Sequence, residues 1–572
     1  MTAKFKKLAA AVLAFCMLAA FSVPVYSASV QPVRAFRVGL FFGSSEVPSA
    51  NLRNADGFGR GFDFGYFDSH RNFVYIGAMT EETGITIMMD RNMVWHSDAA
   101  DGFGEYREGA SGSIVAGCFH IRPDAQYDTF EQARDAANQF QDAFVKYESG
   151  RFIVLIGSYI SREAANSAIS SRGLSGSDVD AGTQHTVTVV RTGTNRVLFE
   201  FDYGGAHHLG VMPRPGGGEN PETWFRGYRY HGGFEYSRRD GSLLTVKNVV
   251  DVEDYIKGIL PYEMNNTWPM EALKAQAVTA RTYAMSSLNR HSANGFDLCT
   301  EVHCQVYNGR NSANDRTDRA VIDTAGMYVT HGNGLAQTFY YSSNGGASEN
   351  SENVWFEARP YLRGVVDPFE ADIAGLIPNY YYTANPTPRQ IADRLRSRGN
   401  SVSGDITRMR IGEYTPTGNV LSVIVTDSSG RDFTVSREAV RTVLGVRSQR
   451  FSFGDAVVGS EGLFANNPAA PIGSGPGNFA INSEGEVIAL PGTALHAITV
   501  TGVSVPLIAG TIVTGSSDIR PVNGVFTITG SGWGHNVGMS QWGARSMAEI
   551  HGMNYVEILT FYFTGVTIRP LD

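Results

Sequence analysis

Hydrophobic residues near the start of the chain occur in short runs separated by glycine and polar residues. Examples are Phe36–Phe42, Asn72–Ala78 and Ile85–Met89, in a stretch that is also rich in aromatic residues. Runs of this length bounded by turn-forming residues are typical of β-strands joined by tight turns. Residues 28–111 are therefore predicted to form a β-rich N-terminal region, and the pattern assigns no chemistry to it.

The pattern changes to alternating strands and helices between residues 112 and 192. Thr129 is followed three residues later by Gln132, a capping-box spacing that satisfies backbone donors at a helix start. The expected elements are a strand at Ile114–Ile121, a helix opened by Thr129, a strand at Arg151–Ile156, a helix at Arg162–Ile169 and a strand at Gln184–Arg191. This order predicts a small α/β sandwich.

Residues 193–572 are expected to form one larger unit that mixes strands and helices. Trp224–Val250 alternates aromatic or aliphatic with polar residues around two glycine-containing turns, which is a hairpin pattern. Pro269 and Glu271 then mark the start of a helix that continues to Met285. Small residues on several of its sides predict a buried helix that supports the preceding sequence PYEM as a turn.

The fold class expected for the whole chain is α+β, multidomain and β-rich. Residues 466–478 combine proline, glycine and serine without hydrophobic periodicity, a composition typical of a flexible loop. A flexible insertion is therefore expected near residues 466–514, inside the unit that begins at residue 193.

The first 27 residues have the composition of a secretory signal peptide. Lys4, Lys6 and Lys7 precede an apolar run from Leu8 to Phe21, which a proline and a small-residue cleavage pattern follow near Ser27. A membrane-spanning helix needs about 20 apolar residues, more than this run offers. The protein is expected to be exported and extracytoplasmic, with no transmembrane helix after cleavage.

Charge and cysteine content exclude two classes of protein. Cleavage at residue 27 removes three lysines and no acidic residue, which takes the formal net charge from −9 to −12. A nucleic-acid-binding protein should present a basic face, so no nucleic-acid partner is expected. Three cysteines remain in the mature chain, too few for a disulfide-rich scaffold. Of these, Cys118 is expected to be a buried, inert thiol.

Four potential metal ligands occur within fourteen residues. They are His291, Cys299, His303 and Cys304. Two thiolates and two imidazoles form a tetrahedral zinc ligand set, and four protein ligands leave no open position for a reacting water, as in structural sites. The alternative is a Cys299–Cys304 disulfide, which would close a tight loop.

Several separated blocks resemble the stage II sporulation protein D / LytB family. The blocks are VEDYIKGILPYEM with WPMEALKAQAVTARTYA, CQVYNG, AQTFYYSSNGGASENSENVW with PYLRGVVD, and GWGHNVGMSQWGARSMAEIHGMNYVEILTFYFTGV. The resemblance covers roughly Trp224 to Ile568 and implies a peptidoglycan-processing role. Sporulation members of the family resemble lytic transglycosylases, whereas the LytB branch is described as enhancing a cell-wall amidase. Some relatives hold a zinc ion in the region of the four candidate ligands.

The resemblance places the family's catalytic acid on Glu263, within PYEM. Cleavage of a glycosidic bond needs a protonated carboxyl group, and apolar neighbours raise the pKa of a carboxyl group enough to keep it protonated. Leu260, Pro261, Tyr262, Met264 and Trp268 supply such neighbours. The alternative is a structural glutamate that holds the turn by hydrogen bonds.

The glycine-rich segment 530–543 is expected to bind sugar next to Glu263. Glycines let a backbone approach a ligand closely, and aromatic faces stack on sugar rings. The expected substrate-binding residues are Tyr262, Trp533, Ser540, Gln541 and Trp542, with Ser343 as a further candidate. His535 is a candidate catalytic residue that would orient the substrate or the acid, or alternatively a packed histidine.

Residues 112–192 also resemble a known domain. YDTFEQARDAANQF and GRFIVLIGSYISREAANSA are similar to SPOR domains, a family that binds glycan strands stripped of their stem peptides. The alternative is a generic α/β spacer.

Two functions follow from the two resemblances: a lytic transglycosylase acting on peptidoglycan glycan strands, and a non-catalytic wall-binding enhancer of an N-acetylmuramoyl-L-alanine amidase. A zinc hydrolase using residues 291–304 is disfavoured.

Overall fold

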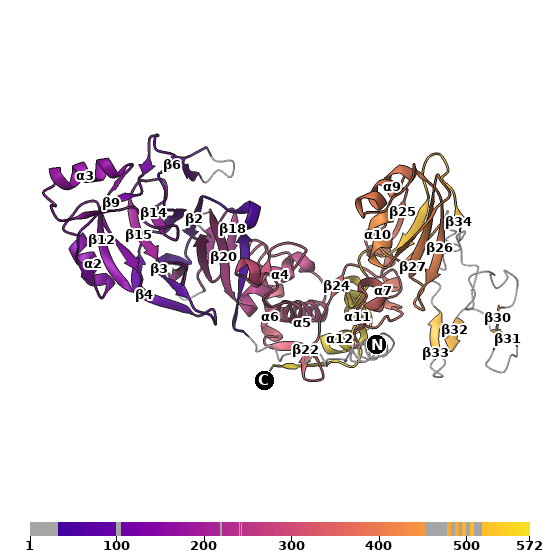
Figure 1. Ribbon diagram of the computed structural model, residues 1–572. Coiled ribbons are helices and arrows are strands. Elements are labelled where there is room, and N and C mark those ends of the chain that lie inside the picture. The colour runs from indigo at the N-terminus through magenta and orange to yellow at the C-terminus, as the bar shows by residue number, and fades with distance from the viewer. Residues whose placement is uncertain are drawn as a thin grey trace, which may run out of the picture.

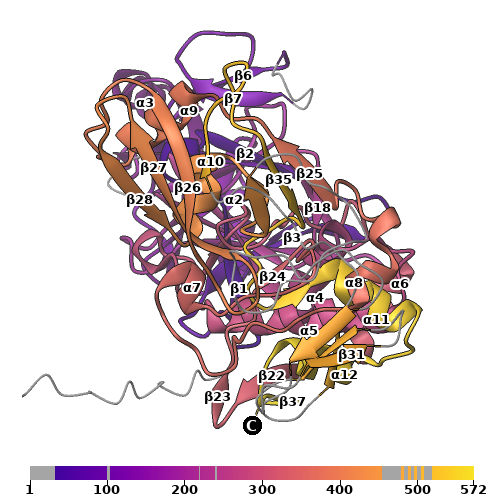
Figure 2. The same ribbon diagram turned by 90° about the vertical axis from the view of Figure 1, so that its right-hand side faces the viewer.

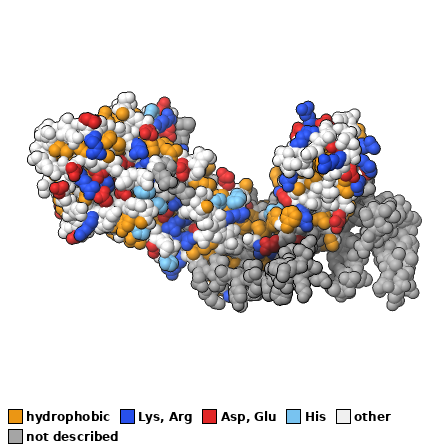
Figure 3. All heavy atoms as spheres, in the orientation of Figure 1, with side chains coloured by type: hydrophobic (Ala, Val, Ile, Leu, Met, Phe, Trp, Pro, Cys, Tyr) orange, Lys and Arg blue, Asp and Glu red, His pale blue; other side chains and the backbone are white. Residues whose placement is uncertain are grey.

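The computed structural model shows two lobes joined by a central helical part (Figure 1). It describes residues 33–98, 104–217, 220–238, 241, 243–453 and 518–571, and the backbone of four strands between residues 478 and 507. In the space-filling view the surface is hollowed between the lobes, above the central part (Figure 3). The predicted signal peptide and most of the predicted insertion at 466–514 lie outside the described residues.

The first lobe contains the two largest sheets of the protein. One has the order β21 (Leu298–Cys299), β1 (Ala35–Phe41), β20 (Leu244–Asp251), β19 (Gly233–Arg238), β16 (Leu209–Pro215), β3 (Gly59–Phe67) and β4 (Phe73–Thr80). The other has the order β13 (Asp178–Asp180), β9 (Phe119–Arg122), β12 (Arg151–Tyr159), β11 (Ala143–Glu148), β15 (Val197–Asp202), β14 (Val187–Arg191), β5 (Gly84–Met89), β2 (Ser49–Asn54), β17 (Thr223–Phe225) and β18 (Tyr228–Tyr230), with β10 (Gln126–Tyr127) beside β12. A smaller sheet joins β7 (Glu105–Glu108), β6 (Met93–His96) and β8 (Val115–Ala116).

These sheets contain strands from all three units predicted between residues 28 and 572. Strand β5 pairs with β14, β14 pairs with β15, and β1 pairs with β20 far along the chain. Alternation along a strand shows which side is buried but not which strand lies beside it. The two predicted helices of residues 112–192 are present as α2 (Phe130–Ala137) and α3 (Arg162–Ser171). The hydroxyl of Thr129 caps α2 by accepting from the backbone N–H of Gln132.

The central part is a bundle of helices packed on the first lobe. Its helices are α4 (Val252–Glu263), α5 (Met270–Ser286), α6 (Asp315–Asp323), α11 (Gln541–Glu549) and α12 (Tyr555–Tyr562). Figure 2 shows α4, α5, α11 and α12 close together, and α5 contacts each of the other three. Helix α5 is buried on nearly every side, as its small residues predict. One hydrophobic core continues from the first lobe into these helices.

The sequence PYEM, predicted to be a turn, is instead mostly the last turn of α4. Pro261 lies inside the helix, three residues before the capping residue Met264. Proline interrupts a helix mainly by lacking an N–H and by crowding the preceding turn. Here the helix ends directly afterwards, so Glu263 becomes its last residue.

An ion pair between buried Arg281 and half-buried Glu253 ties α5 to α4. Arg281 is fully buried, and its guanidinium group donates to both carboxylate oxygens of Glu253 and to the backbone carbonyls of Met327 and Val321. Losing Arg281 leaves the Glu253 carboxylate, whose side chain is 27% exposed, without its cation, and it removes hydrogen bonds to a charged group worth about 1.5–3 kcal/mol each. We expect Arg281→Ala to lower the free energy of unfolding by about 3 kcal/mol, visible as a lower thermal midpoint, whereas exposed Arg319→Ala should leave the midpoint nearly unchanged.

The second lobe has its own hydrophobic core. Its strands are β25 (Tyr381–Ala384), β35 (Ile528–Ser531) and β29 (Phe451–Phe453) in one sheet, and β28 (Asp432–Ser436), β27 (Val420–Asp427), β26 (Ile406–Tyr414) and β34 (Asp518–Ile519) in another. Helices α9 (Pro388–Ser397) and α10 (Glu438–Leu444) complete it. Buried Glu349 connects this lobe to the central part by accepting hydrogen bonds from Thr415, Thr417 and Asn419.

The remaining elements are short. They are β22 (Met327–His331), β23 (Gly334–Leu335), β37 (Thr567–Pro570), β24 (Tyr340–Tyr341), β36 (Met539–Ser540), α7 (Glu352–Trp355), α8 (Phe369–Asp372), β30 (Asn478–Ile481), β31 (Val487–Leu490), β32 (Leu495–Ile498) and β33 (Ser504–Leu507). The predicted α+β, multidomain, β-rich fold class is confirmed. Within the described residues, no helix is long and apolar enough to span a membrane.

Candidate active site

Glu263 lies at the end of α4, where β24 and α11 meet this helix. The Tyr340 hydroxyl of β24 donates to Glu263 Oε1 at 3.0 Å, and the Gln541 amide of α11 donates to Glu263 Oε2 at 3.3 Å. Glu263 itself is half-buried. Residues far apart in the sequence thus hold one carboxyl group from both sides. The structure brings the predicted residues Glu263 and Gln541 together.

The surroundings of Glu263 favour its protonated form. Burial raises the pKa of Glu263 above its ordinary value, and the hydrogen bonds from Tyr340 and Gln541 oppose this shift without cancelling it. The carboxyl group is also at the C-terminal end of α4, where the helix dipole disfavours a negative charge. A carboxyl group in this setting is suited to giving up a proton and taking it back.

A chain of hydrogen bonds fixes the direction of the Tyr340 proton. The buried amide of Gln305 donates to the Tyr340 hydroxyl at 3.2 Å and to the carbonyl of Ala280 at 3.3 Å, while its oxygen accepts from Tyr255. Since the Tyr340 oxygen accepts from Gln305, its own proton is left to point at Glu263. Glu263 Oε1 therefore accepts the shorter hydrogen bond, from Tyr340. Oε2 accepts only the longer one, from Gln541, and is the oxygen more available to a ligand.

Sequence reasoning missed Tyr340 and Gln305. Both lie in blocks that carry the family resemblance, Gln305 in CQVYNG and Tyr340 in AQTFYYSSNGG. Their place inside these two blocks is the signal that could have found them. Neither residue type by itself marks the surroundings of an acid, so the contacts of Tyr340 with Glu263 and of Gln305 with Tyr340 become visible only in three dimensions.

The predicted aromatic residues near Glu263 pack mainly against protein. The rings of Trp268 and Trp542 are 4.7 Å apart and tilted by 57°, and the Arg545 guanidinium lies 5.1 Å from the Trp542 ring. The Tyr262 hydroxyl donates to the carbonyl of Asn308. Trp542 and Tyr262 are half-buried, so each presents part of its ring to solvent.

The segment 530–543 divides into an exposed and a buried part. Trp533 is 49% exposed and lies under the Arg447 guanidinium, whose carbon is 4.7 Å from the ring centre. Ser540 is fully buried: its hydroxyl caps α11 and donates to Glu370. Ser343 is also buried and pairs with Trp533 through the backbone. Trp533 therefore offers a surface for a ligand, whereas Ser540 shapes the site from beneath.

Two buried carboxyl groups support this segment from below. Glu370 accepts from the backbone N–H groups of Asn344 and Gly345 in addition to Ser540. Asp367 accepts from Tyr562 and from the Asn344 side chain. Burial, followed by the charge of Asp367, raises the pKa of Glu370 to about 8. The pair was not singled out from the sequence, where it stands in the unremarkable run VVDPFEAD.

His535 is enclosed by aromatic rings. The rings of Trp355, Tyr341 and Phe339 have centres 4.9, 5.3 and 6.2 Å from the imidazole. Nδ1 accepts from the backbone N–H of Val537. Burial lowers the pKa of His535 to about 3, so the ring is neutral at physiological pH. Among the described contacts none joins His535 to Glu263, and its catalytic role stays a prediction.

The four candidate zinc ligands converge at one point. One ligand atom each from His291, Cys299, His303 and Cys304 lies within 4.8 Å of every other. Cys304 Sγ is 3.4 Å from His291 Nε2 and 3.7 Å from His303 Nδ1. Ligand atoms about 2.0–2.3 Å from a tetrahedral zinc ion are separated from one another by distances similar to those between Cys304 Sγ and the two imidazole nitrogens, so this donor set fits zinc.

Both cysteines of this cluster are free thiols. A hydrogen bond between them lowers the pKa of Cys299 to about 4 and raises that of Cys304. Cys304 directly precedes Gln305, whose amide orients Tyr340 toward Glu263. Whatever fixes Cys304 therefore also fixes the hydrogen bonds at the candidate acid.

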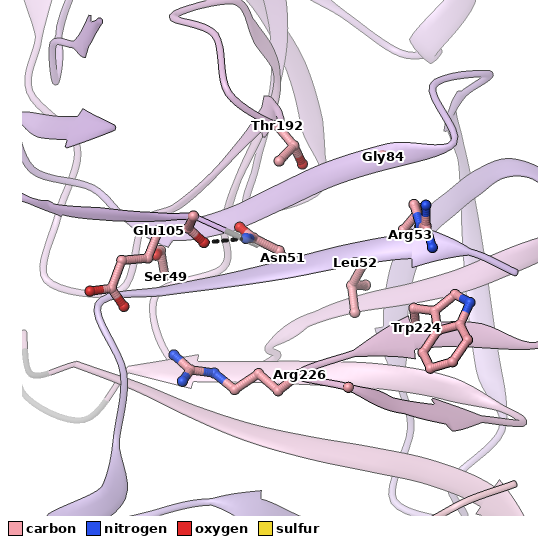
Figure 4. A pocket seen from close by; sticks show the side chains of 11 residues that line it. Ser49, Asn51, Leu52, Arg53, Gly84, Glu105, Thr192, Trp224 and Arg226 are labelled. Atoms are coloured by element: carbon pink, nitrogen blue, oxygen red, sulfur yellow. Dashed lines mark hydrogen bonds between the residues drawn. The ribbon is translucent and has the colours of Figure 1, made fainter. Parts of the chain in front are cut away.

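A separate hollow of about 200 Å³ lies in the first lobe (Figure 4). Trp224, Arg226 and Arg53 line one part of it, and Asn51, whose amide donates to the carbonyl of Gly104, lines another. Its lining comes from β2, β17, β7 and adjoining residues, with none from α4, α5 or α11. Sequence reasoning assigned Trp224 only to a strand.

Residues 240–331 match the family model described as Stage II sporulation protein. The matched part of the chain includes Glu263, helix α5 and the four candidate zinc ligands. The resemblance to the family seen in the sequence is confirmed. The match does not extend to Tyr340 or Gln541.

Three known proteins are similar to longer stretches of the chain. An uncharacterised protein of Brachyspira hyodysenteriae is 29% identical over 393 residues, which are 68% of this chain and 84% of that protein. The amidase enhancer of Bacillus subtilis is 30% identical over 320 residues, 55% of this chain and 40% of the enhancer. Stage II sporulation protein D of Bacillus amyloliquefaciens is 25% identical over 345 residues, 57% of this chain and 76% of that protein.

Proposed function

We propose that the protein cleaves the glycan strands of peptidoglycan as a lytic transglycosylase, with Glu263 as its general acid and base. The observation that carries the proposal is a single half-buried glutamate with a raised pKa, held by Tyr340 and Gln541. Similarity to sporulation protein D and to an amidase enhancer supports a role at the cell wall. The predicted signal peptide agrees with an extracytoplasmic location.

One carboxyl group is sufficient for this reaction. Protonated Glu263 donates its proton from Oε2 to the glycosidic oxygen, and the bond from the sugar carbon to that oxygen breaks. The carboxylate then removes the proton from the sugar's own 6-hydroxyl, whose oxygen closes a 1,6-anhydro ring on the same carbon. Glycosidases that use water need a second carboxylate as base or nucleophile.

The zinc proposal gives residues 291–304 a structural role. Cys299, Cys304, His303 and His291 would hold one zinc ion, which would supply a rigid link between four points of the chain. The four protein ligands fill a tetrahedral site. A fixed Cys304 would also fix the neighbouring Gln305. Because Gln305 directs the Tyr340 proton, the metal site would in this way help to orient the donor to Glu263.

Tyr340→Phe is expected to change the pH dependence of cleavage. Activity requires protonated Glu263, so it falls as the pH rises through the pKa of this group. Removing the Tyr340 donor destabilises the carboxylate and raises this pKa further, which shifts the alkaline limb of the kcat/KM profile to higher pH. The maximal rate should drop about 10-fold because the acid loses one of its two anchors. Tyr328→Phe, in strand β22, is the control, and an unshifted limb in Tyr340→Phe would contradict the assignment.

A second function has one specific observation in its favour. The match to the amidase enhancer of Bacillus subtilis is compatible with a non-catalytic protein that binds peptidoglycan and stimulates an N-acetylmuramoyl-L-alanine amidase. In that case residues 112–192, with their SPOR-like sequence, would recruit the protein to glycan strands. The two functions differ in product: a transglycosylase alone releases anhydro-sugar fragments, whereas an enhancer alone releases nothing.

A further inference from the structure

A second group of metal-ligating side chains is buried in the first lobe, outside the site built around Glu263. It consists of Asp90, which directly follows β5, His120 on β9 and Glu200 on β15. Their exposed fractions are 2%, 1% and 0%. Strands β12 and β11 separate β9 from β15, and β14 separates β15 from β5. The large sheet therefore curls enough for side chains from distant strands to meet.

The three side chains have the geometry of a metal site. One ligand atom from each lies within 4.8 Å of the other two. His120 Nε2 is 3.0 Å from Glu200 Oε1, yet neither His120 Nε2 nor Glu200 Oε2 has a hydrogen-bond partner among the described residues. A buried polar atom without a partner is costly, so the unpaired Glu200 Oε2, together with the 3.0 Å approach of His120 Nε2 to Glu200 Oε1, points to a missing group at this place.

The second nitrogen of His120 shows which form of the ring suits the site. Its Nδ1 lies 2.7 Å from the carbonyl oxygen of Gly157, which can only accept, so Nδ1 carries the proton. In a neutral ring the lone pair of Nε2 then faces the Glu200 carboxylate, an arrangement that repels unless a cation lies between them. A backbone carbonyl on one ring nitrogen and a metal on the other is the usual environment of a ligating histidine.

The charge around the three side chains also calls for a cation. Asp90, Glu200 and the nearby Asp180 bring three carboxyl groups together, with Lys146 paired to Asp180 and Arg238 close enough to act on Asp90. Burial and then the charge of Glu200 raise the pKa of Asp90, because these two groups repel each other when both are ionised. Arg122 is shared between Asp180 and Glu148 and leaves no surplus of positive charge. A divalent ion bound by both Asp90 and Glu200 would remove the repulsion between these two carboxyl groups.

A protonated His120 is the competing arrangement. In this arrangement both ring nitrogens carry a proton, and Nε2–H faces Glu200 Oε1 at 3.0 Å. That proton neutralises only one charge and leaves Glu200 Oε2 without a partner. A divalent ion would replace this proton and would be bound by His120 Nε2 and by the Glu200 carboxylate.

We propose that Asp90, His120 and Glu200 bind one divalent transition-metal ion, of the zinc and manganese class, that ties three distant strands of the first lobe together. One imidazole and two carboxylates are ligands that such ions accept. The site is closed on all sides, so its role is structural. It is independent of Glu263 and of the cysteine–histidine cluster, which lies at β21 in the other large sheet.

The test uses Mn²⁺, because carboxylate and imidazole ligands suit this ion and thiolates do not, so the cysteine site stays silent. Electron paramagnetic resonance of purified protein titrated with Mn²⁺ is expected to show one bound ion per chain, with a raised thermal midpoint. His120→Gln, which keeps a donor for Gly157, should weaken Mn²⁺ binding at least about 10-fold. His70→Gln, at an exposed histidine of the same lobe, should bind as the wild type does.

Two results would overturn the proposal. One is wild-type protein that binds no Mn²⁺ and at most one Zn²⁺, when that one zinc ion is lost in the Cys299→Ser, Cys304→Ser variant and so belongs to the cysteine site. The other is a folded His120→Gln variant with unchanged Mn²⁺ affinity. Should His120→Gln fail to fold, Asp90→Asn and the wild-type titration decide, since absence of wild-type binding alone refutes the site.

Discussion

Glu263→Gln is expected to lower the rate of glycan cleavage by at least about 100-fold, the lower end of what general acid catalysis contributes. Glutamine keeps the shape of the side chain and an oxygen that accepts from Tyr340, but it has no acidic proton for the glycosidic oxygen. The fold should be unaffected, since the group is half-buried at a helix end. Release of soluble fragments from purified peptidoglycan measures the rate.

Glu413→Gln, at an exposed carboxylate of the second lobe, is the matched control and should cleave at the wild-type rate. A folded Glu263→Gln variant that cleaves as fast as the wild type would remove Glu263 from the mechanism. Adding an amidase separates the second function: stimulation of stem-peptide release that survives Glu263→Gln would show an enhancing activity that does not need the acid.

The paired variant Cys299→Ser, Cys304→Ser is expected to lose one zinc per chain and to cleave glycan about 10–100-fold more slowly, as outer-shell changes commonly do. The effect reaches Glu263 without direct contact. Cys304 holds the neighbouring Gln305, and Gln305 donates to Tyr340, which donates to Glu263. Metal analysis of the purified variant measures the zinc, and the fragment assay measures the rate.

Cys118→Ser is the control, because this thiol lies in the first lobe and hydrogen-bonds Asn92. It should keep both the zinc and the activity. Wild-type protein without zinc, in which Cys299 and Cys304 resist thiol reagents until reduced, would instead establish the disulfide. Loss of zinc with an unchanged rate would break the proposed link between the metal site and the acid.

Local sequence patterns predicted the parts of the site that are local in the chain. The small residues of α5 predicted a helix buried on several sides, which the structure has, and the spacing of four histidines and cysteines predicted a cluster whose ligand atoms do lie close together. In both cases neighbours in sequence are neighbours in space. Glu263 was identified through the family resemblance. A single carboxylate in an apolar stretch would not by itself have been a strong enough signal.

The parts that sequence could not predict depend on contacts between distant residues. Tyr340 and Gln305 are ordinary core residues until the fold places them at Glu263, 77 residues away in the case of Tyr340. Ser540 was expected to face a sugar, yet its hydroxyl is turned inward to Glu370. Residue type suggested the chemistry, but the direction of the side chain decides what it touches.

Strand pairing shows the same limit on a larger scale. Alternating residues in β5 predicted a strand correctly, but its partner β14 lies about a hundred residues further along. The second lobe has its own core and was not separated from residues 193–572, because no composition change marks its edges. Domain boundaries that depend on strand pairing involve residues far apart in the chain, whereas hydrophobic patterns describe only neighbouring residues.

The mass spectrum of fragments released from peptidoglycan by the purified protein alone distinguishes a transglycosylase from an enhancer. We expect glycan fragments that end in a 1,6-anhydro sugar, each lighter by one water than a hydrolysis product, and we expect none with Glu263→Gln. Fragments with a free reducing end would show hydrolysis. A spectrum with no new glycan fragments from active, folded wild-type protein would contradict the transglycosylase and leave the enhancer.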